Sequence, residues 1–432
     1  MSTSSHALLN RRAFLKTSAS IAGIAAAATL LPSSDTTRPI SASLTRSVAS
    51  GAPLTIGVLL PRSASHPAVG QNVLAGMRLY ADQAAGRSLR LVAEEIGVGQ
   101  RDAYWGARKL LEQDHVDLLA GVVNPGPAAG LHDLLHEHRA ILTIADVGAN
   151  VPRQIETHPQ IFTSSLGYWQ ASHAMGSWAA QNLGRRAAVV TSFYDSGYDT
   201  IYAFRLGFES AGGQIAETFV SHRPLDSGDH MPALMAQIKA AQPDFVYAIS
   251  SGREADAFLR AYADSGLAGR IPLAGASFTL AEQAARAPGR SLPDMPMVLP
   301  WAHNLGHAEN QAFTTNYQSV IGRPADALAL LGYDTAQLID TAVAAAGDVR
   351  DTRRLQQALG QVAFVSPRGA VAIDPRTGSL AGPLYLGVAQ QNGAGVRHVA
   401  LEPISAPSEH DQQIAALRTS TKSGWINAYL CV

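Results

Sequence analysis

Cysteine is almost absent from this chain, and aromatic residues and net charge are scarce as well. The single cysteine is Cys431, so no disulfide can form within the chain and packed cores must supply its stability. Lys and Arg total 33 against 34 Asp and Glu, a net charge of -1, which excludes a field that would draw nucleic acid or an anionic membrane to the protein. Because aromatic residues make up only 6% of the chain, a group of them near predicted strand ends would be notable.

Signature motifs of catalysis and cofactor binding are also missing. The sequence has no HExxH, no paired CxxC, no GxSxG, no phosphate loop and no GxGxxG after a strand. His132 and His136 are spaced one helical turn apart, as zinc ligands can be, and His138 follows. The same stretch alternates with leucines, which is typical of an amphipathic surface helix. The sequence places no third ligand beside these histidines, so we expect no bound metal. Because the catalytic and cofactor motifs are missing as well, we expect no cofactor and no enzymatic activity.

The N-terminal segment carries an export pattern. Arg11 and Arg12 precede an apolar residue two places on and then a short apolar run, 21–31, which is typical of a twin-arginine signal peptide. The run is too short to span a bilayer, which takes roughly 20 apolar residues. We expect 1–52 to be this signal and a linker. The twin-arginine machinery would export the chain, and removal of the signal would leave a soluble periplasmic protein. A basic leader without an export role is the alternative.

Short apolar runs alternate with helical patterns along the rest of the chain. Runs typical of buried strands span 54–60, 88–92, 116–123, 140–144, 187–191, 245–249 and 297–299. Helical patterns span 70–85, 103–113, 128–138, 169–182, 198–211, 231–241 and 254–265. This alternation predicts parallel sheets built from right-handed βαβ units. Ligands of such sheets bind outside the carboxyl ends of the strands.

Five segments in a fixed order carry the pattern of a known family. They span 54–76, 101–123, 236–267, 315–347 and 364–378. The fourth is the most specific, because it contains Tyr317, Gly322-Arg323-Pro324 and Gly332-Tyr333-Asp334 at the spacing of that family. From about 54 to about 388, the chain resembles the leucine/isoleucine/valine-binding family of type I periplasmic binding proteins.

The resemblance implies an α/β fold with two doubly wound, flavodoxin-like lobes joined by three crossover strands. Lobe 1 would take 53–166 plus 301–382, lobe 2 would take 167–300 plus 383–405, and 406–432 would form a C-terminal extension. The resemblance further implies that a small ligand binds in the cleft between the lobes, that hinge closure captures it, and that an ABC permease receives it. A periplasmic ligand sensor is an alternative, and an exported enzyme is a less favoured one.

Several positions depart from the amino-acid binders of this family. The resemblance places the family's carboxylate-binding serine and threonine on Pro125 and Gly148. It places the cleft tyrosines on Ser196 and Ser251, and the ammonium-binding glutamate on or beside Ser277. An α-amino acid would lose about 1–3 kcal/mol for each buried group left without a partner. We therefore expect a ligand other than a simple branched-chain amino acid, with a flat or apolar body and few charges.

The candidate ligand-binding residues follow strand ends and crossovers. They are Asn124, Pro125, Gly126, Asp146, Val147, Gly148, Trp169, Tyr194, Ser196, Tyr198, Ser251, Ser277, Phe278 and Trp301. The aromatic members could stack on a flat ligand, or they could pack the edges of the lobes. Asp146 could hold a cation or hydroxyl of the ligand, or it could stabilise its own loop.

Overall fold

The computed structural model describes residues 53–62, 68–84, 86, 88–97, 99–123, 125–150, 158–192, 195–221, 230–276, 294–392 and 395–405. These residues belong to one unit, Ser50–Val432. The predicted signal with Arg11 and Arg12 and the predicted extension 406–432 lie outside the described residues, as do the candidates Asn124, Tyr194, Ser277 and Phe278. Within the described ranges, no helix combines the length and apolar character needed to cross a membrane.

The largest sheet has eight strands in the order β11-β12-β13-β5-β4-β3-β1-β2. Their bounds are β1 Leu54–Pro61, β2 Leu89–Ile96, β3 Leu118–Gly121, β4 Leu142–Asp146, β5 Ile161–Ser165, β11 Ala363–Ser366, β12 Gly369–Asp374 and β13 Ser379–Ala381. Strands β1 to β5 run parallel to one another, and β13 joins β5 in parallel, whereas β11, β12 and β13 pair antiparallel. The sequence of strand β1 is mostly apolar, in agreement with the burial of this strand along nearly its whole length. We call the part of the chain built on this sheet lobe 1.

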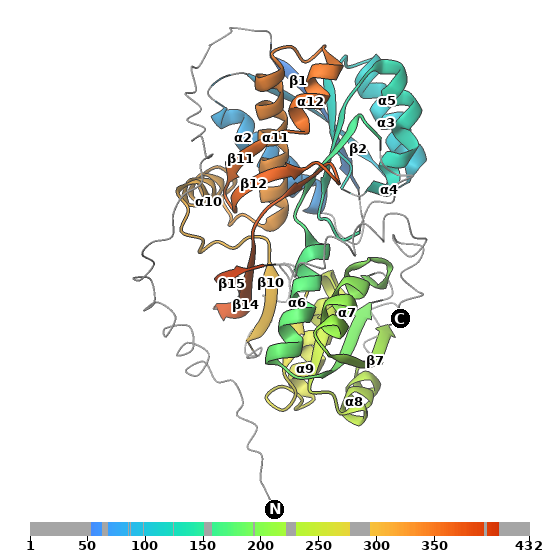
Figure 1. The fold of residues 1–432 in the computed structure, drawn as a ribbon, viewed down its shortest axis with the longest axis vertical. Coiled ribbons are helices and arrows are strands. Elements are labelled where there is room, and N and C mark those ends of the chain that lie inside the picture. Colours follow the sequence, from blue (N-terminus) through green and yellow to red (C-terminus); the bar gives the residue numbers. More distant parts are fainter. Residues whose placement is uncertain are drawn as a thin grey trace, which may run out of the picture. The chain divides into compact units, whose positions relative to one another are not determined.

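Two helices of lobe 1, α2 and α11, lie side by side in Figure 1 and approach each other closely. A Cβ atom on Gly76 of α2 would lie 1.8 Å from the Ala329 carbonyl oxygen, and one on Gly332 of α11 would lie 1.9 Å from the Val73 carbonyl oxygen. Glycine is therefore required at the crossing. The helices of lobe 1 are α2 Ala68–Gln83, α3 Gln100–Glu112, α4 Pro125–Ala128, η1 Ala129–Leu131, α5 His132–His138, α10 Ala308–Ile321, α11 Ala327–Ala346 and α12 Thr352–Leu359.

The second sheet has four parallel strands in the order β7-β6-β8-β9 and defines lobe 2. Its elements are α6 Tyr168–Asn182, β6 Arg186–Ser192, η3 Asp195–Gly197, α7 Thr200–Ser210, β7 Gln214–Ser221, α8 Met231–Ala241, β8 Phe245–Ile249, α9 Gly252–Asp264 and β9 Leu273–Gly275. The ring of Phe204 on α7 stacks on Tyr247 of β8 with centroids 3.7 Å apart. This contact packs α7 against one face of the sheet.

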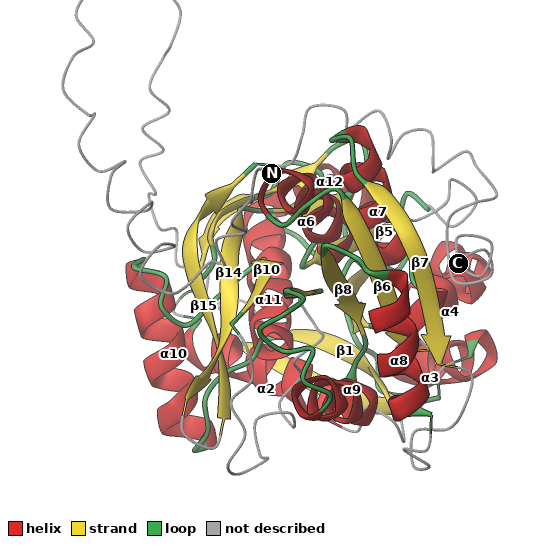
Figure 2. Cartoon of the chain, turned by 90° about the horizontal axis from the view of Figure 1, so that it is seen from below, coloured by secondary structure: helices red, strands yellow, loops and turns green. Residues whose placement is uncertain are grey.

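A third sheet is antiparallel and was not predicted. Strands β10 (Met295–Leu299), β14 (Leu384–Asn392) and β15 (Gly395–Ile404) lie together in Figure 2, in the order β10-β14-β15. The sequence reading of parallel sheets therefore holds for β1 to β9, whereas β10, β11, β12, β14 and β15 pair antiparallel and β13 pairs in both senses. Strands that follow one another directly, such as β11 and β12 or β14 and β15, can pair antiparallel without a crossover helix. The predicted class, two α/β lobes, is confirmed. The lobe boundaries at 166, 300 and 382 stay a prediction.

Candidate ligand-binding site

Asp146 ends β4 at the carboxyl edge of the lobe 1 sheet, and its side chain is buried, with 5% exposed. The backbone N–H groups of Val147 and Gly148 donate hydrogen bonds to its carboxyl group. Burial raises the pKa of Asp146 to about 7, and these two hydrogen bonds oppose the rise. Asp146 thus stabilises its own loop, and near neutral pH its carboxyl group exists in both protonation states.

Gly148 occupies a position that has no room for a side chain. Its φ is +72°, and a Cβ atom there would lie 2.2 Å from the Ser165 hydroxyl oxygen and 2.9 Å from the Gly167 nitrogen. The loop is also bonded to the start of α6, because the Val147 and Gly148 carbonyls accept from the backbone N–H groups of the first two residues of that helix at 3.1 and 2.7 Å. A hydroxyl side chain of the kind that binds carboxylate in the amino-acid binders does not fit at Gly148 without displacing these neighbours.

The loop after β3 leads into the four-residue helix α4, which begins at Pro125. A proline nitrogen carries no hydrogen, so the first residue of this helix offers no backbone N–H to a ligand. The Gly126 carbonyl accepts a hydrogen bond from the Gln100 side chain of α3 at 3.2 Å. This interaction fixes α4 to α3 at the same edge of the sheet.

The sequence analysis missed Asp195, which organises the lobe 2 edge. Its side chain is 1% exposed. One carboxylate oxygen accepts from the Ser192 hydroxyl at 2.6 Å and from the Ser251 backbone N–H at 2.9 Å, and the other accepts from the Ser251 hydroxyl at 2.9 Å. Asp195 therefore joins the carboxyl ends of β6 and β8, and the predicted site residue Ser251 is held by it. The neighbouring candidate Ser196 is buried in η3.

The structure brings the two candidate edges together. The Asn150 side-chain oxygen, in the loop after β4, accepts a hydrogen bond from the Asp199 backbone N–H at 2.9 Å. Asp199 immediately precedes α7 and follows the candidate Tyr198. The Asp146–Gly148 loop of lobe 1 and the Ser196–Tyr198 segment of lobe 2 are thus placed near one another, as a site between the lobes requires.

The described aromatic candidates make extensive contacts within the protein. Trp169 is buried in α6, where its ring stacks on His173 at 5.5 Å and packs against Ala203 of α7. Trp301 donates from its ring nitrogen to the Asn310 side-chain oxygen at 2.7 Å. Tyr198 is half-buried and packs on the largest apolar cluster. Packing accounts for these contacts, and stacking on a ligand stays a prediction for all three.

The histidine-rich stretch lies on α5 of lobe 1. His132 and His136 both lie on α5, as the spacing predicts, and His132 stacks on His158 with ring centroids 4.8 Å apart. His138 lies 3.6 Å from the Glu112 carboxylate. Among the residues that the structure describes, no group of three or more His, Cys, Asp or Glu side chains is arranged to hold a metal ion.

Two α/β lobes with polar residues at their strand ends are typical of ligand-binding proteins of the periplasmic type. The sequence profile of the periplasmic binding protein family matches residues 53–394. The chain belongs to this family. The match stops short of both segments that lie outside the described residues at the chain ends.

Individual relatives agree with the family assignment. The Leu/Ile/Val-binding protein homolog 6 of Brucella abortus (strain 2308) is 26% identical over 353 residues, which cover 80% of this chain and 89% of that protein. An ABC transporter substrate-binding protein from Sphaerobacter thermophilus is 26% identical, with a TM-score of 0.73 and coverage of 82% and 98%. An ABC transporter solute-binding protein from R. palustris, crystallised with benzoate, is 25% identical, with a TM-score of 0.68 and coverage of 83% and 98%.

Proposed function

We propose that this protein is the exported solute-binding component of an ABC importer. It captures a small organic ligand between its lobes, closes around the ligand by a hinge motion and presents the closed form to permease subunits. Family membership supports this function, since the relatives are solute-binding proteins and not enzymes. The Asn150–Asp199 contact supports it as well, because it brings the loop edges of both lobes together. We infer that the ligand leaves the protein chemically unchanged.

We further propose that the ligand is a flat, weakly charged organic molecule, and that aromatic carboxylic acids are the first class to test. The observation that carries this proposal is the loop after β4. The Asp146 carboxyl group already accepts both backbone N–H groups of the loop, and Gly148 cannot carry a hydroxyl side chain. Any ligand carboxylate would have to compete with this internal carboxyl for the two donors. An α-amino acid also brings an ammonium group, and the position predicted to bind it carries Ser277 in place of a glutamate. The benzoate bound by the R. palustris relative belongs to the proposed class.

Thermal unfolding across a ligand panel tests this selectivity. We expect benzoate or a hydroxylated benzoate to raise the melting temperature, because a ligand at 100 times its Kd stabilises the folded state by about 2.7 kcal/mol. Leucine, isoleucine and valine should leave the melting temperature unchanged. Calorimetry and chemical analysis of the eluted ligand complete the test. Micromolar leucine binding that weakens in Ser196→Ala and Ser251→Ala would contradict the proposal, and recovery of a converted product would make the protein an enzyme.

Export is tested by the signal arginines. Replacing both Arg11 and Arg12 with lysine should leave full-length precursor in the cytoplasm, because the twin-arginine pathway selects the arginine pair and not positive charge. Cell fractionation followed by immunoblotting measures the outcome. The control variant replaces Arg38 and Arg46, which lie in the linker, with lysine and should be exported normally. Normal export of the Arg11/Arg12 variant would exclude the twin-arginine route.

A further inference from the structure

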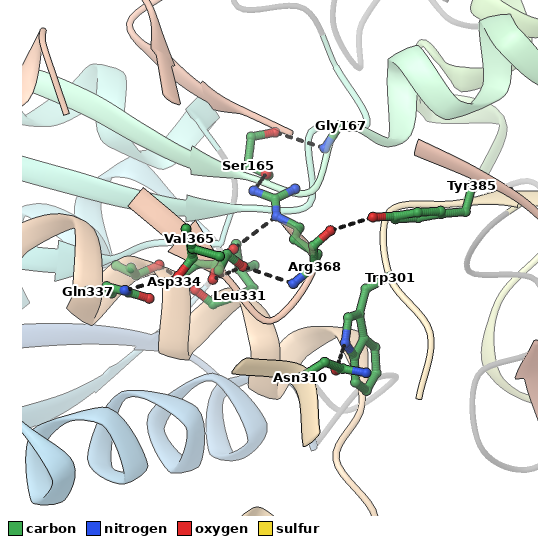
Figure 3. Close-up of polar contacts among 12 residues, drawn as sticks. Ser165, Gly167, Trp301, Asn310, Leu331, Asp334, Gln337, Val365, Arg368 and Tyr385 are labelled. Carbon is green, nitrogen blue, oxygen red and sulfur yellow. Dashed lines mark hydrogen bonds and ion pairs between the residues drawn. The ribbon is translucent and has the colours of Figure 1, made fainter. Parts of the chain in front are cut away.

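An ion pair is buried in lobe 1 where the chain leaves the eight-stranded sheet. The Arg368 Nε lies 3.0 Å from the Asp334 carboxylate, and the two side chains are 2% and 1% exposed. The Ser366 hydroxyl donates to the second carboxylate oxygen of Asp334 at 2.7 Å. Figure 3 shows the guanidinium group between Asp334 and the end of β5. These residues belong to two of the segments that carry the family resemblance, so the pair joins α11 to the turn between β11 and β12.

Arg368 also contacts the segments that pass between the sheets. Its guanidinium donates to the Ser165 carbonyl at 2.9 Å, and Ser165 is the last residue of β5 before the crossover 166–167. The Tyr385 hydroxyl donates to the Arg368 carbonyl at 2.7 Å, and Tyr385 lies in β14 just after the crossover 382–383. His307, from the segment after β10, has its ring Nε2 3.4 Å from the Tyr385 hydroxyl. Arg368 thus bonds directly to residues that adjoin two crossovers, and Tyr385 links it to His307, which lies a few residues after the third boundary at 300–301.

The same cluster adjoins the candidate ligand site. The Ser165 hydroxyl accepts from the Gly167 backbone N–H at 3.1 Å, at the start of α6. The position that a Cβ atom of Gly148 would take lies 2.2 Å from this hydroxyl. A shift of the Ser165 backbone would therefore press the Ser165 side chain against the loop that contains Asp146. The geometry provides a contiguous path from Arg368 to the ligand loop, and no atom of Arg368 has to touch a ligand.

Stability alone does not explain why an ion pair occupies this position. Burial pushes the pKa of Asp334 upward, and the Arg368 guanidinium and Ser366 hydroxyl oppose the rise. Well-packed apolar residues often replace a buried ion pair with no loss of stability. They cannot supply the directed hydrogen bond from the guanidinium to the Ser165 carbonyl, whereas the main-chain carbonyl of residue 368 would still be present to accept from Tyr385. The ion pair can therefore hold the backbone at the start of the crossover in one position, which an apolar pair of side chains could not do.

We propose that Arg368, held by Asp334, is a positioning residue for lobe closure. It fixes the crossovers 166–167 and 382–383 relative to each other, and so it sets the range of lobe orientations and, through that range, the affinity for ligand. This inference rests on the proposed function as a closing solute-binding protein. It predicts that removal of the ion pair loosens the lobe arrangement even where the fold survives.

The test measures lobe geometry without a ligand. Spin labels at Asp82→Cys on α2 and Ser210→Cys on α7, both exposed, report an interlobe distance distribution in a Cys431→Ser background. The variant Arg368→Met with Asp334→Leu removes both charges together, so no unpaired charge stays buried. We expect its distance distribution to broaden. Tyr385→Phe removes only the hydroxyl bond, and we expect it to broaden the distribution less while it folds normally.

A matched control removes a more exposed ion pair from a neighbouring turn. Arg376 contacts Asp374 at 2.9 Å, and the two side chains are 60% and 20% exposed, so Arg376→Met with Asp374→Leu makes the same chemical change at a site that is much less buried. This control should keep the wild-type distribution. With benzoate as the probe, we expect at least a tenfold weaker affinity for Arg368→Met/Asp334→Leu than for the control, and an intermediate value for Tyr385→Phe.

The outcomes separate this inference from the proposed ligand class. If the wild-type protein binds neither benzoate nor a hydroxylated benzoate, the ligand class is wrong, and the unliganded distance distribution still tests Arg368. If Arg368→Met/Asp334→Leu fails to fold, the distribution of Tyr385→Phe decides the question. An unchanged distribution in the variants that fold would show that the ion pair has no positioning role and would overturn the inference.

Discussion

Gly332→Ala should lower the free energy of unfolding by about 3 kcal/mol or more, because an inserted side-chain carbon in a packed interior forces backbone shifts. The added Cβ atom would lie 1.9 Å from the Val73 carbonyl oxygen, so α2 and α11 would have to separate. Alanine favours a helix over glycine by about 1 kcal/mol, which is too little to offset this overlap. Urea unfolding followed by circular dichroism measures the effect.

The control for this substitution is another glycine of lobe 1. A Cβ atom on Gly306 would meet nothing within 4 Å, so Gly306→Ala should change stability by no more than about 0.5 kcal/mol. Equal unfolding midpoints for Gly332→Ala and Gly306→Ala would mean that α2 and α11 do not approach as closely as the structure shows.

Asp146→Asn should raise stability most at alkaline pH. The pKa of Asp146 is about 7 in the folded protein, whereas an aspartate in an unfolded chain titrates near about 3.9. Between these values the folded state holds a proton that the unfolded state has lost, so stability falls as pH rises from about 4 to 7. The whole interval corresponds to at most about 4 kcal/mol, since one pKa unit equals about 1.4 kcal/mol. An asparagine side-chain oxygen can still accept from the two loop N–H groups and carries no charge to desolvate.

The measurement is the stability difference between Asp146→Asn and the wild-type protein from pH 4 to pH 8. The difference isolates this one group, because all other titrating groups are shared. Asp82→Asn on the exposed side of α2 is the control and should follow the wild-type curve. Stability curves that stay parallel for Asp146→Asn and the wild-type protein would show that the carboxyl group of Asp146 is not buried as described.

The sequence predicted the helices and strands whose signal lies within a few consecutive residues. The predicted strand 245–249 and helix 231–241 coincide with β8 and α8, because a short apolar run and an amphipathic period are both visible within a few residues. Strand β5 was missed, since its sequence Ile-Phe-Thr-Ser-Ser is half polar. The helix predicted at 128–138 begins earlier, at Pro125, and passes through the 3-10 turn Ala129–Leu131, where Gly130 lies against Gln100 of α3. That interruption depends on a contact that the local sequence does not show.

Contacts between distant segments also limited the prediction of the candidate site. Strand alternation placed Asp146 at a sheet edge, and the structure confirms that position. Asp195 follows a strand in the same way, yet its role depends on Ser251, which approaches it only because β6 and β8 are neighbours in the sheet. Trp169 and Trp301 could not be assigned either, because an aromatic residue that packs a lobe edge and one that stacks on a ligand have the same sequence signature.

The pairing of β13 with β5 has a consequence for how the chain is made. Ser379 pairs with Thr163, and Arg368 bonds to Ser165 across 203 residues of sequence. During synthesis at about 5–20 residues per second, β5 therefore waits roughly 10–40 s with one row of backbone N–H and C=O groups unpaired, which invites association with other chains. Lobe 2 has no such wait within its own sheet, since β6 to β9 are contiguous in the chain. A nascent chain would thus hold the finished sheet β6 to β9 beside an unfinished first lobe. If the chain takes the export route for folded proteins that we propose, we expect it to do so only after its last third has emerged.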